Sequence, residues 1–171
     1  MIRSFLVLFL SIHVYAAEPS AQDQFWKSLQ ALCGKTLQGE IEIDRYDRKL
    51  EGKPSMHVRI CEDDRIEIPF AVGEDRSRTW ILTRTNTGLR LKHEHRHKDG
   101  TLDEVTDYGG DTKSAGEAGR QSFVVDEYTK KLVANTDKNL WVFEIKDGYV
   151  AYELYKGEAE PNFRVAFKIQ P

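Results

Sequence analysis

Alternation of apolar and polar residues with a period of two runs through most of this chain after residue 40. The clearest run covers residues 65–72, where every second residue is apolar, namely Ile66, Ile68, Phe70 and Val72. Successive side chains of a strand point to opposite faces, so this pattern predicts half-buried β-strands. Similar runs occur at 41–43, 58–60, 80–82, 89–97, 123–125, 140–145, 150–155 and 163–169. The pattern therefore predicts an all-β fold.

Turn-forming residues separate these runs and predict antiparallel hairpins. They are Asp63-Asp64, Asn86-Thr87-Gly88, Lys98-Asp99-Gly100-Thr101 and Lys146-Asp147-Gly148. The only long helical pattern is residues 23–33, which ends at Gly34, and a short helix is expected at 126–133. About ten short strands without crossover helices are typical of an antiparallel sandwich or barrel.

Of these two architectures we favour an up-and-down β-barrel whose short N-terminal helix closes one end. A helix that precedes a long meander commonly plugs a barrel in this way. The inward polar groups described next also need a cavity, which a flattened sandwich core does not offer. The length of 171 residues suits one domain. We expect a single barrel domain over residues 17–171.

Three histidines lie on one face of the strand predicted at 89–97. Alternation places them beside two leucines, in the order Leu89, Leu91, His93, His95 and His97. The other face carries only charged residues, namely Arg90, Lys92, Glu94 and Arg96. Because charged side chains belong in water, the Leu/His face belongs inside. The change from leucine to imidazole predicts a cavity with an apolar floor and a polar mouth.

The two hairpin turns beside this strand predict which residues face the histidines. If Asn86-Thr87 is a two-residue loop, Leu82 faces Leu91, Trp80 faces His93, Arg78 faces His95 and Arg76 faces His97. If Asp99-Gly100 is the next such loop, Leu91 faces Tyr108, His93 faces Thr106 and His95 faces Glu104. On the outer face, this second register pairs Arg96 with Asp103 and Lys92 with Asp107, which are favourable opposite charges.

The predicted ligand-binding residues follow from this register. They are Arg76, Arg78, Trp80, His93, His95, His97, Glu104 and Tyr108. Alternate residues on a strand lie about 6.6–7 Å apart, so one ion with metal–nitrogen bonds near ~2.1 Å cannot collect all three imidazoles. Two imidazoles plus Glu104 could bind a metal, but two neighbouring arginines disfavour a cation. We therefore predict no metal and no cofactor, and an anionic group at the mouth.

Two other interpretations of the polar cluster remain open. In one, a buried Arg/His/Glu network only holds the sheet together and binds nothing. In the other, His95 and Glu104 form a proton-transfer pair, or hold a metal, in a hydrolase or lyase. Neither Ser77 nor Ser122 lies in a nucleophile-elbow pattern, and we assign no catalytic residue.

The first residues of the chain are typical of a secretory signal peptide. Arg3 precedes an apolar run at residues 5–14, and small residues follow at Ala16 and Ala17. We expect residues 1–16 to be removed, and no later segment is apolar enough to insert into a membrane. The formal net charge of −3 gives no general attraction to nucleic acid. We expect an exported, periplasmic or secreted protein.

The chain has two cysteines, Cys33 and Cys61. An even number in an exported chain predicts a disulfide, here between the N-terminal helix and the second strand. The alternative is a pair of buried free thiols.

Four segments, 32–35, 73–80, 88–100 and 108–112, resemble a family of small exported bacterial proteins. The 88–100 block, with its arginine and histidine residues, is the most specific of them. The resemblance implies bacterial origin and export to the periplasm, and it carries over no catalytic or binding residue. The expected architecture is similar in shape to lipocalin-like (calycin-like) barrels, although the chain lacks their Gly-x-Trp signature.

We therefore expect an exported, non-enzymatic barrel that binds a small amphipathic or anionic molecule. The alternatives are the metal-dependent or His/Glu-dependent hydrolase or lyase in the same cavity, and a structural envelope protein. The sequence predicts no nucleic-acid partner and leaves the oligomeric state open.

Overall fold

The computed structural model describes residues 18–46, 48 and 50–170. The signal peptide predicted at residues 1–16 lies outside the described residues. Two helices are present in the described part, α1 (Ala21–Gln30) and α2 (Glu127–Leu132). The strands are β1 (Thr36–Asp44), β2 (Pro54–His57), β3 (Ile60–Cys61), β4 (Arg65–Val72), β5 (Asp75–Thr85), β6 (Gly88–His95), β7 (Tyr108–Asp111), β8 (Arg120–Val125), β9 (Asn139–Lys146), β10 (Tyr149–Lys156) and β11 (Phe163–Lys168).

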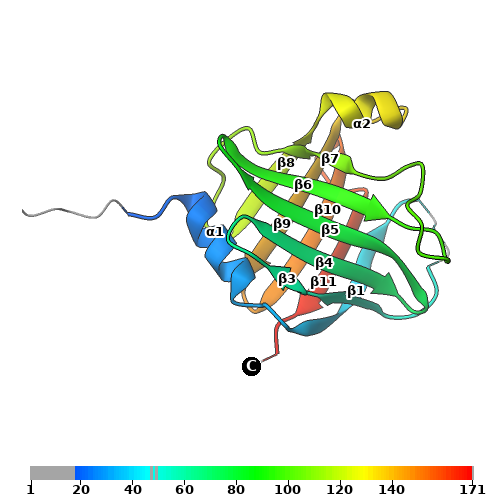
Figure 1. Cartoon of the computed structure of the whole chain (residues 1–171), viewed down its shortest axis with the longest axis horizontal. Coiled ribbons are helices and arrows are strands. Elements are labelled where there is room, and N and C mark those ends of the chain that lie inside the picture. Colours follow the sequence, from blue (N-terminus) through cyan, green and yellow to red (C-terminus); the bar gives the residue numbers. More distant parts are fainter. Residues whose placement is uncertain (1–17, 47, 49, 171) are drawn as a thin grey trace, which may run out of the picture.

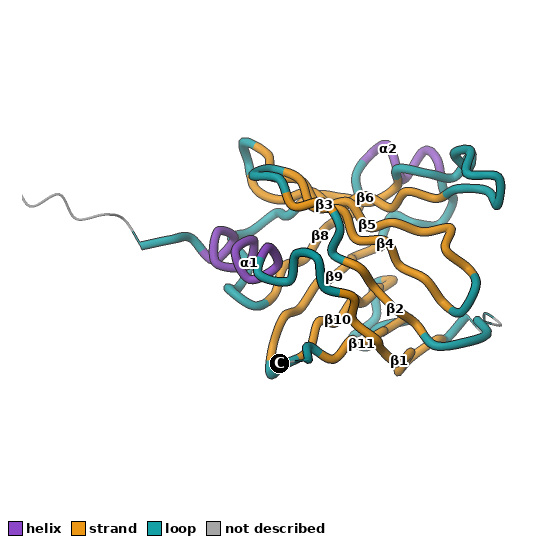
Figure 2. Tube along the Cα trace, turned by 60° about the horizontal axis from the view of Figure 1, so that its bottom comes forward, coloured by secondary structure: helices purple, strands orange, loops and turns teal. Residues whose placement is uncertain are grey.

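The strands form a closed antiparallel barrel (Figures 1 and 2). The sheet order is β2-β1-β11-β10-β9-β8-β7-β6-β5-β4-β3, and pairing of β2 with β4 closes a ring of ten strands. The short β3 continues the line of β2 along β4 and adds no further position to the ring. The structure confirms the predicted all-β up-and-down barrel.

The α1 helix lies across one end of the barrel (Figure 1). Ser20 and Asp23 form a capping box, which satisfies backbone N–H groups of its first turn. Its apolar side chains Phe25, Trp26 and Leu29 are buried in the common core. The helix therefore plugs this end, as the sequence predicted, and we refer to it as the closed end.

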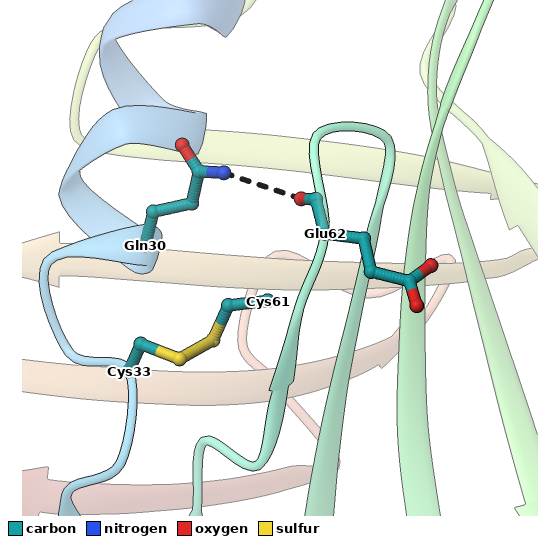
Figure 3. Close-up of a disulfide and its surroundings, with 4 residues drawn as sticks. All are labelled: Gln30, Cys33, Cys61 and Glu62. Atoms are coloured by element: carbon teal, nitrogen blue, oxygen red, sulfur yellow. Dashed lines mark hydrogen bonds between the residues drawn. A yellow bond between two sulfur atoms is a disulfide. The ribbon is translucent and has the colours of Figure 1, made fainter.

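A disulfide joins the segment after α1 to the barrel wall (Figure 3). Cys33 bonds Cys61 of β3, with Cα atoms 6.2 Å apart. The Gln30 side-chain amide donates to the backbone oxygen of Glu62 at 3.2 Å beside it. The predicted disulfide is confirmed, and it fixes the closed end covalently.

The first predicted hairpin register is confirmed. Thr85 pairs with Gly88 across the Asn86-Thr87 turn, so Trp80 faces His93 and Arg78 faces His95. The β5–β6 ladder ends at this last pair, and Arg76 does not pair with His97.

The second predicted register is wrong. Tyr108 faces His93 and Gly110 faces Leu91, whereas the prediction placed Thr106 and Tyr108 there. Five residues, 103–107, lie outside the named strands between the hairpin tip and β7.

Local hydrogen bonds explain this detour. Asp99 accepts from the backbone and the hydroxyl of Thr101, which tightens the hairpin tip. The Thr106 hydroxyl then accepts a hydrogen bond from the His95 backbone N–H at 2.9 Å. This N–H is therefore not available to the strand pairing that the sequence predicted. The expected outer-face pairs of Arg96 and Lys92 do not form, since Arg96 binds Glu94 and Lys92 binds Asp126.

The β7 backbone is held between β6, β8 and α2. A Cβ atom on Gly110 would lie 1.8 Å from the Val124 carbonyl oxygen, so only glycine fits there. The Gly109 N–H donates to the Thr129 hydroxyl of α2 at 2.7 Å. This close packing sets the position of the neighbouring Tyr108 side chain at the end of the barrel opposite α1.

Candidate functional site at the open end of the barrel

A cavity of about 310 Å³ lies inside the barrel, away from α1. Its deeper wall is aromatic and includes Trp80, Trp141 and Tyr152. Two arginines, Arg48 and Arg78, line it as well. This volume lies at the lower end of the range for small-molecule sites, roughly 300–1,000 Å³. We refer to this region as the open end.

The aromatic floor is built by inward-facing residues from separate strands. Trp80 of β5 stacks between Phe70 of β4 and Tyr152 of β10, with ring centroids 4.6 Å apart in each pair. Trp80 also meets the edge of Phe143 of β9. These residues are inward because they occupy the apolar positions of the alternating pattern. They give the cavity a rigid apolar base.

Both ring nitrogens of His93 are hydrogen-bonded to groups of the barrel itself. Its Nδ1 lies 3.0 Å from the Tyr108 carbonyl oxygen, and its Nε2 lies 2.6 Å from the Tyr152 hydroxyl. A carbonyl can only accept, so Nδ1 carries the proton and Nε2 accepts from Tyr152. Burial lowers the pKa of His93 to about 3. This imidazole stays neutral and offers no nitrogen to a ligand or metal.

His95 is the half-buried imidazole nearer the mouth. Its Nε2 lies 3.0 Å from the Tyr108 hydroxyl. Burial raises the pKa of Tyr108 to about 12, so the phenol keeps its proton. Either group can be the donor of this bond, because a neutral phenol both donates and accepts. Burial, and next the positive charge of Arg78, lower the pKa of His95.

The two arginines approach the cavity from different parts of the wall. Arg78 is in β5, and Arg48 follows β1, three strands away around the ring through β2 and β4. Arg78 binds Asp75 at 2.6 Å through Nη1 alone. Arg48 binds Asp44 through Nε and Nη2, and its guanidinium lies 4.4 Å over the Phe163 ring. Each guanidinium keeps N–H groups that these carboxylates do not engage.

The cavity therefore brings together five of the eight predicted residues, which are Arg78, Trp80, His93, His95 and Tyr108. Arg76 and His97 instead line a separate surface depression at the hairpin tips. Glu104 lies in the 103–107 segment with 88% of its side chain exposed. Its position beside His95 was wrongly predicted because the second register was wrong, and no His95–Glu104 proton-transfer pair exists.

Sequence reasoning missed Arg48, Tyr152 and Asn139. Tyr152 lies in the alternating run at 150–155, in which we predicted no binding residue. Asn139 shares its face of β9 with Trp141, so alternation could have found it. Arg48 lies after β1 in a segment without periodicity, and no sequence signal pointed to it.

One group of described residues has metal-ligating types close together, namely His97, Asp103 and Glu104. Asp103 lies 3.8 Å from Nδ1 of the imidazole and Glu104 lies 3.6 Å from Nε2. A single metal takes one nitrogen of a histidine, whereas these carboxylates approach opposite nitrogens. The arrangement fits exposed ion pairing.

Comparison with protein-family models, curated proteins and solved structures finds no match to this chain. The resemblance to small exported bacterial proteins thus stays a prediction. Within the described ranges, neither helix has the length and apolar character needed to cross a membrane.

Proposed function

We propose that this chain is an exported, non-enzymatic binding protein that holds one small amphipathic organic anion in the open-end cavity. The observation that carries this proposal is the combination of an aromatic floor with two partly engaged arginines, Arg48 and Arg78. Burial of apolar surface supplies a non-directional attraction of roughly 25 cal/mol per Å². The guanidinium groups add charge-assisted hydrogen bonds and select a carboxylate, sulfonate or phosphate head.

A permanent charge on both arginines supports an anion over a cation. Guanidinium stays protonated at every relevant pH, so a cation in this cavity would meet repulsion from two directions. The half-buried His95 also lines the cavity, and its ring nitrogen Nδ1 has no hydrogen-bond partner among the described residues, so it is free to contact a ligand.

The hydrolase or lyase alternative loses its main support. The Glu104 side chain is almost fully exposed to solvent, and both ring nitrogens of His93 are hydrogen-bonded within the barrel. Export is supported by the disulfide, since such bonds persist in oxidising compartments. A periplasmic or secreted location is therefore part of this proposal.

The test compares an amphipathic anion with its uncharged analogue. Anilinonaphthalene sulfonate and anilinonaphthalene have the same aromatic body, and their fluorescence rises in apolar surroundings. We expect the sulfonate to bind more tightly and Arg78→Ala to remove that advantage, a change of about tenfold in Kd. Arg76→Ala is the matched control, because it deletes the same charge outside the cavity.

Equal effects of Arg78→Ala and Arg76→Ala would show that the anion does not bind in this cavity. Absence of any binding at millimolar ligand would contradict the proposal as a whole and favour a structural envelope role.

A further inference from the structure

Asn139 has a buried polar atom without a partner. It is the first residue of β9, it is only 6% exposed, and its side-chain oxygen has no hydrogen-bond donor among the described residues. Three other buried side-chain atoms share this property, on Trp26, Gln121 and Asn162. Of these four residues, Asn139 alone lines the open-end cavity.

An amide oxygen removed from water needs a donor, and nearly all such atoms in folded proteins have one. No donor that lines the cavity lies within hydrogen-bond distance of this oxygen. Two of these donors have other partners, since the Tyr152 hydroxyl donates to His93 and Nη1 of Arg78 donates to Asp75. A donor on a ligand in the cavity would satisfy this oxygen.

The barrel topology separates this acceptor from the two arginines. Asn139 is in β9, four strands from Arg78 in β5 along the path through β8, β7 and β6. It is three strands from β1, which leads to Arg48. The three side chains thus line one cavity from three sectors of its wall. A ligand that contacts all three side chains carries its acidic group and its hydrogen-bond donor at separate positions.

The surfaces between these polar points are aromatic. Trp80 and Trp141 face the cavity from β5 and β9, the two strands that also carry Arg78 and Asn139. Flat apolar surfaces of this kind favour a planar or aromatic body.

We infer that the ligand is a small planar organic acid that carries a hydroxyl or N–H donor away from its acidic group, and that Asn139 is the residue that selects this donor. The inference rests on the proposed function, because it assigns a second recognition point within the same cavity. A site that hydrogen-bonds a ligand hydroxyl rejects the analogue that lacks it, since the site's own polar group is then left unpaired.

The experiment uses two acids that differ only at one position. Para-hydroxyphenylacetate and para-methylphenylacetate have the same carboxylate and ring, and hydroxyl and methyl groups are similar in size. Calorimetric titration of the mature protein should give a Kd about tenfold lower for the hydroxylated acid. Asn139→Leu should abolish this preference by weakening the hydroxylated acid and by strengthening or sparing the methylated one.

Asn162→Leu is the matched control. It removes another buried amide whose oxygen lacks a partner among the described residues, but outside the cavity. The preference for the hydroxylated acid should survive it. Thermal unfolding of both variants checks that each remains folded.

The other outcomes separate this inference from the proposed function. Equal binding of the two acids, with loss of both in Arg78→Ala, would overturn the role of Asn139 and leave anion binding intact; a water on Asn139 would have this effect. A preference that persists in Asn139→Leu would also overturn it. If neither acid binds and anilinonaphthalene sulfonate does, the ligand class is wrong. Failure of all three to bind would contradict the proposed function itself.

Discussion

The two ends of this barrel use similar residue types for opposite purposes. At the closed end, Arg84 binds Asp23 and its guanidinium lies 5.4 Å over the Trp26 ring, so the cation covers a buried apolar plug. At the open end, Arg78 also binds an aspartate, Asp75, yet it borders a cavity instead of a packed core.

The difference lies in what the chain places beneath each arginine. The α1 helix inserts aromatic and aliphatic side chains into the closed end, and the disulfide holds the segment after it against β3. At the open end, α2 packs against β7 and adds no residue to the apolar core, and inward side chains of β5, β6 and β9 line a cavity. We expect mutations at the closed end to change stability, and mutations at the open end to change binding.

The largest effect on stability should come from the plug. Phe25 is fully buried, and Phe25→Ala should lower the free energy of unfolding by about 3–5 kcal/mol, through lost transfer energy and a new cavity. Leu50→Ala, in a half-buried position at the open end, should cost about 1 kcal/mol or less. Urea unfolding monitored by tryptophan fluorescence measures both. Similar losses at the two positions would show that the ends do not divide stability in this way.

Loss of the disulfide should have the next largest effect. Cys33 and Cys61 are separated by 28 residues, and the Cys33→Ser/Cys61→Ser variant should unfold with about 3–4 kcal/mol less free energy in the chain-entropy model. Binding of anilinonaphthalene sulfonate should be retained where the variant is folded, because the bridge lies at the other end. Thiol titration of the unfolded, unreduced wild-type protein should find no free cysteine. Two free thiols would contradict the pairing.

Acidification should destabilise the barrel through His93. Its pKa is about 3 in the folded state, against 6.5 for the unperturbed group, so the unfolded chain binds a proton that the folded chain refuses. This contribution to stability is complete above pH 6.5 and is lost progressively as the pH falls toward 3. Between pH 8 and pH 5 the loss should be about 2 kcal/mol.

Urea unfolding at several pH values measures this slope. His93→Gln should flatten it, whatever the variant does to stability at pH 8. His97→Gln, which changes an exposed imidazole outside the cavity, should leave the slope unchanged. An identical slope in wild type and His93→Gln would show that other groups dominate.

The smallest expected effect is a pH dependence of anion binding through His95. Burial and Arg78 lower its pKa in the free protein, and a bound anion would raise it by stabilising the imidazolium. Affinity for anilinonaphthalene sulfonate should therefore rise as pH falls from about 8 to 5.5, by up to about tenfold for each unit that the pKa rises. His95→Gln should remove this rise, and His93→Gln should not, because His93 stays neutral over this range. A rise that His93→Gln abolishes would reverse the assignment.

Several features could be predicted from local sequence patterns. Alternation in residues 65–72 and 80–82 fixed which side chains face inward, because a strand has a strict period of two. The Asn86-Thr87 turn set the pairing of Trp80 with His93, since a two-residue loop permits only one register. The helix that plugs the barrel and the disulfide partner of Cys33 followed from equally local signals, an amphipathic segment and an even cysteine count.

The composition of the site depended on contacts that no local pattern contains. Hydrogen bonds of the Thr101 and Thr106 side chains compete with the ladder and move Glu104 into solvent. Arg48 lines the cavity because β1 pairs with β2 and β11 in the closed ring. Asn139 lines the same cavity because the ring also places the inner face of β9 there. Sequence alone thus determined the all-β class and the inward faces of its strands, and it favoured a barrel over a sandwich. Closure of the ring decided which side chains share the cavity, because that depends on pairings between residues far apart in the chain.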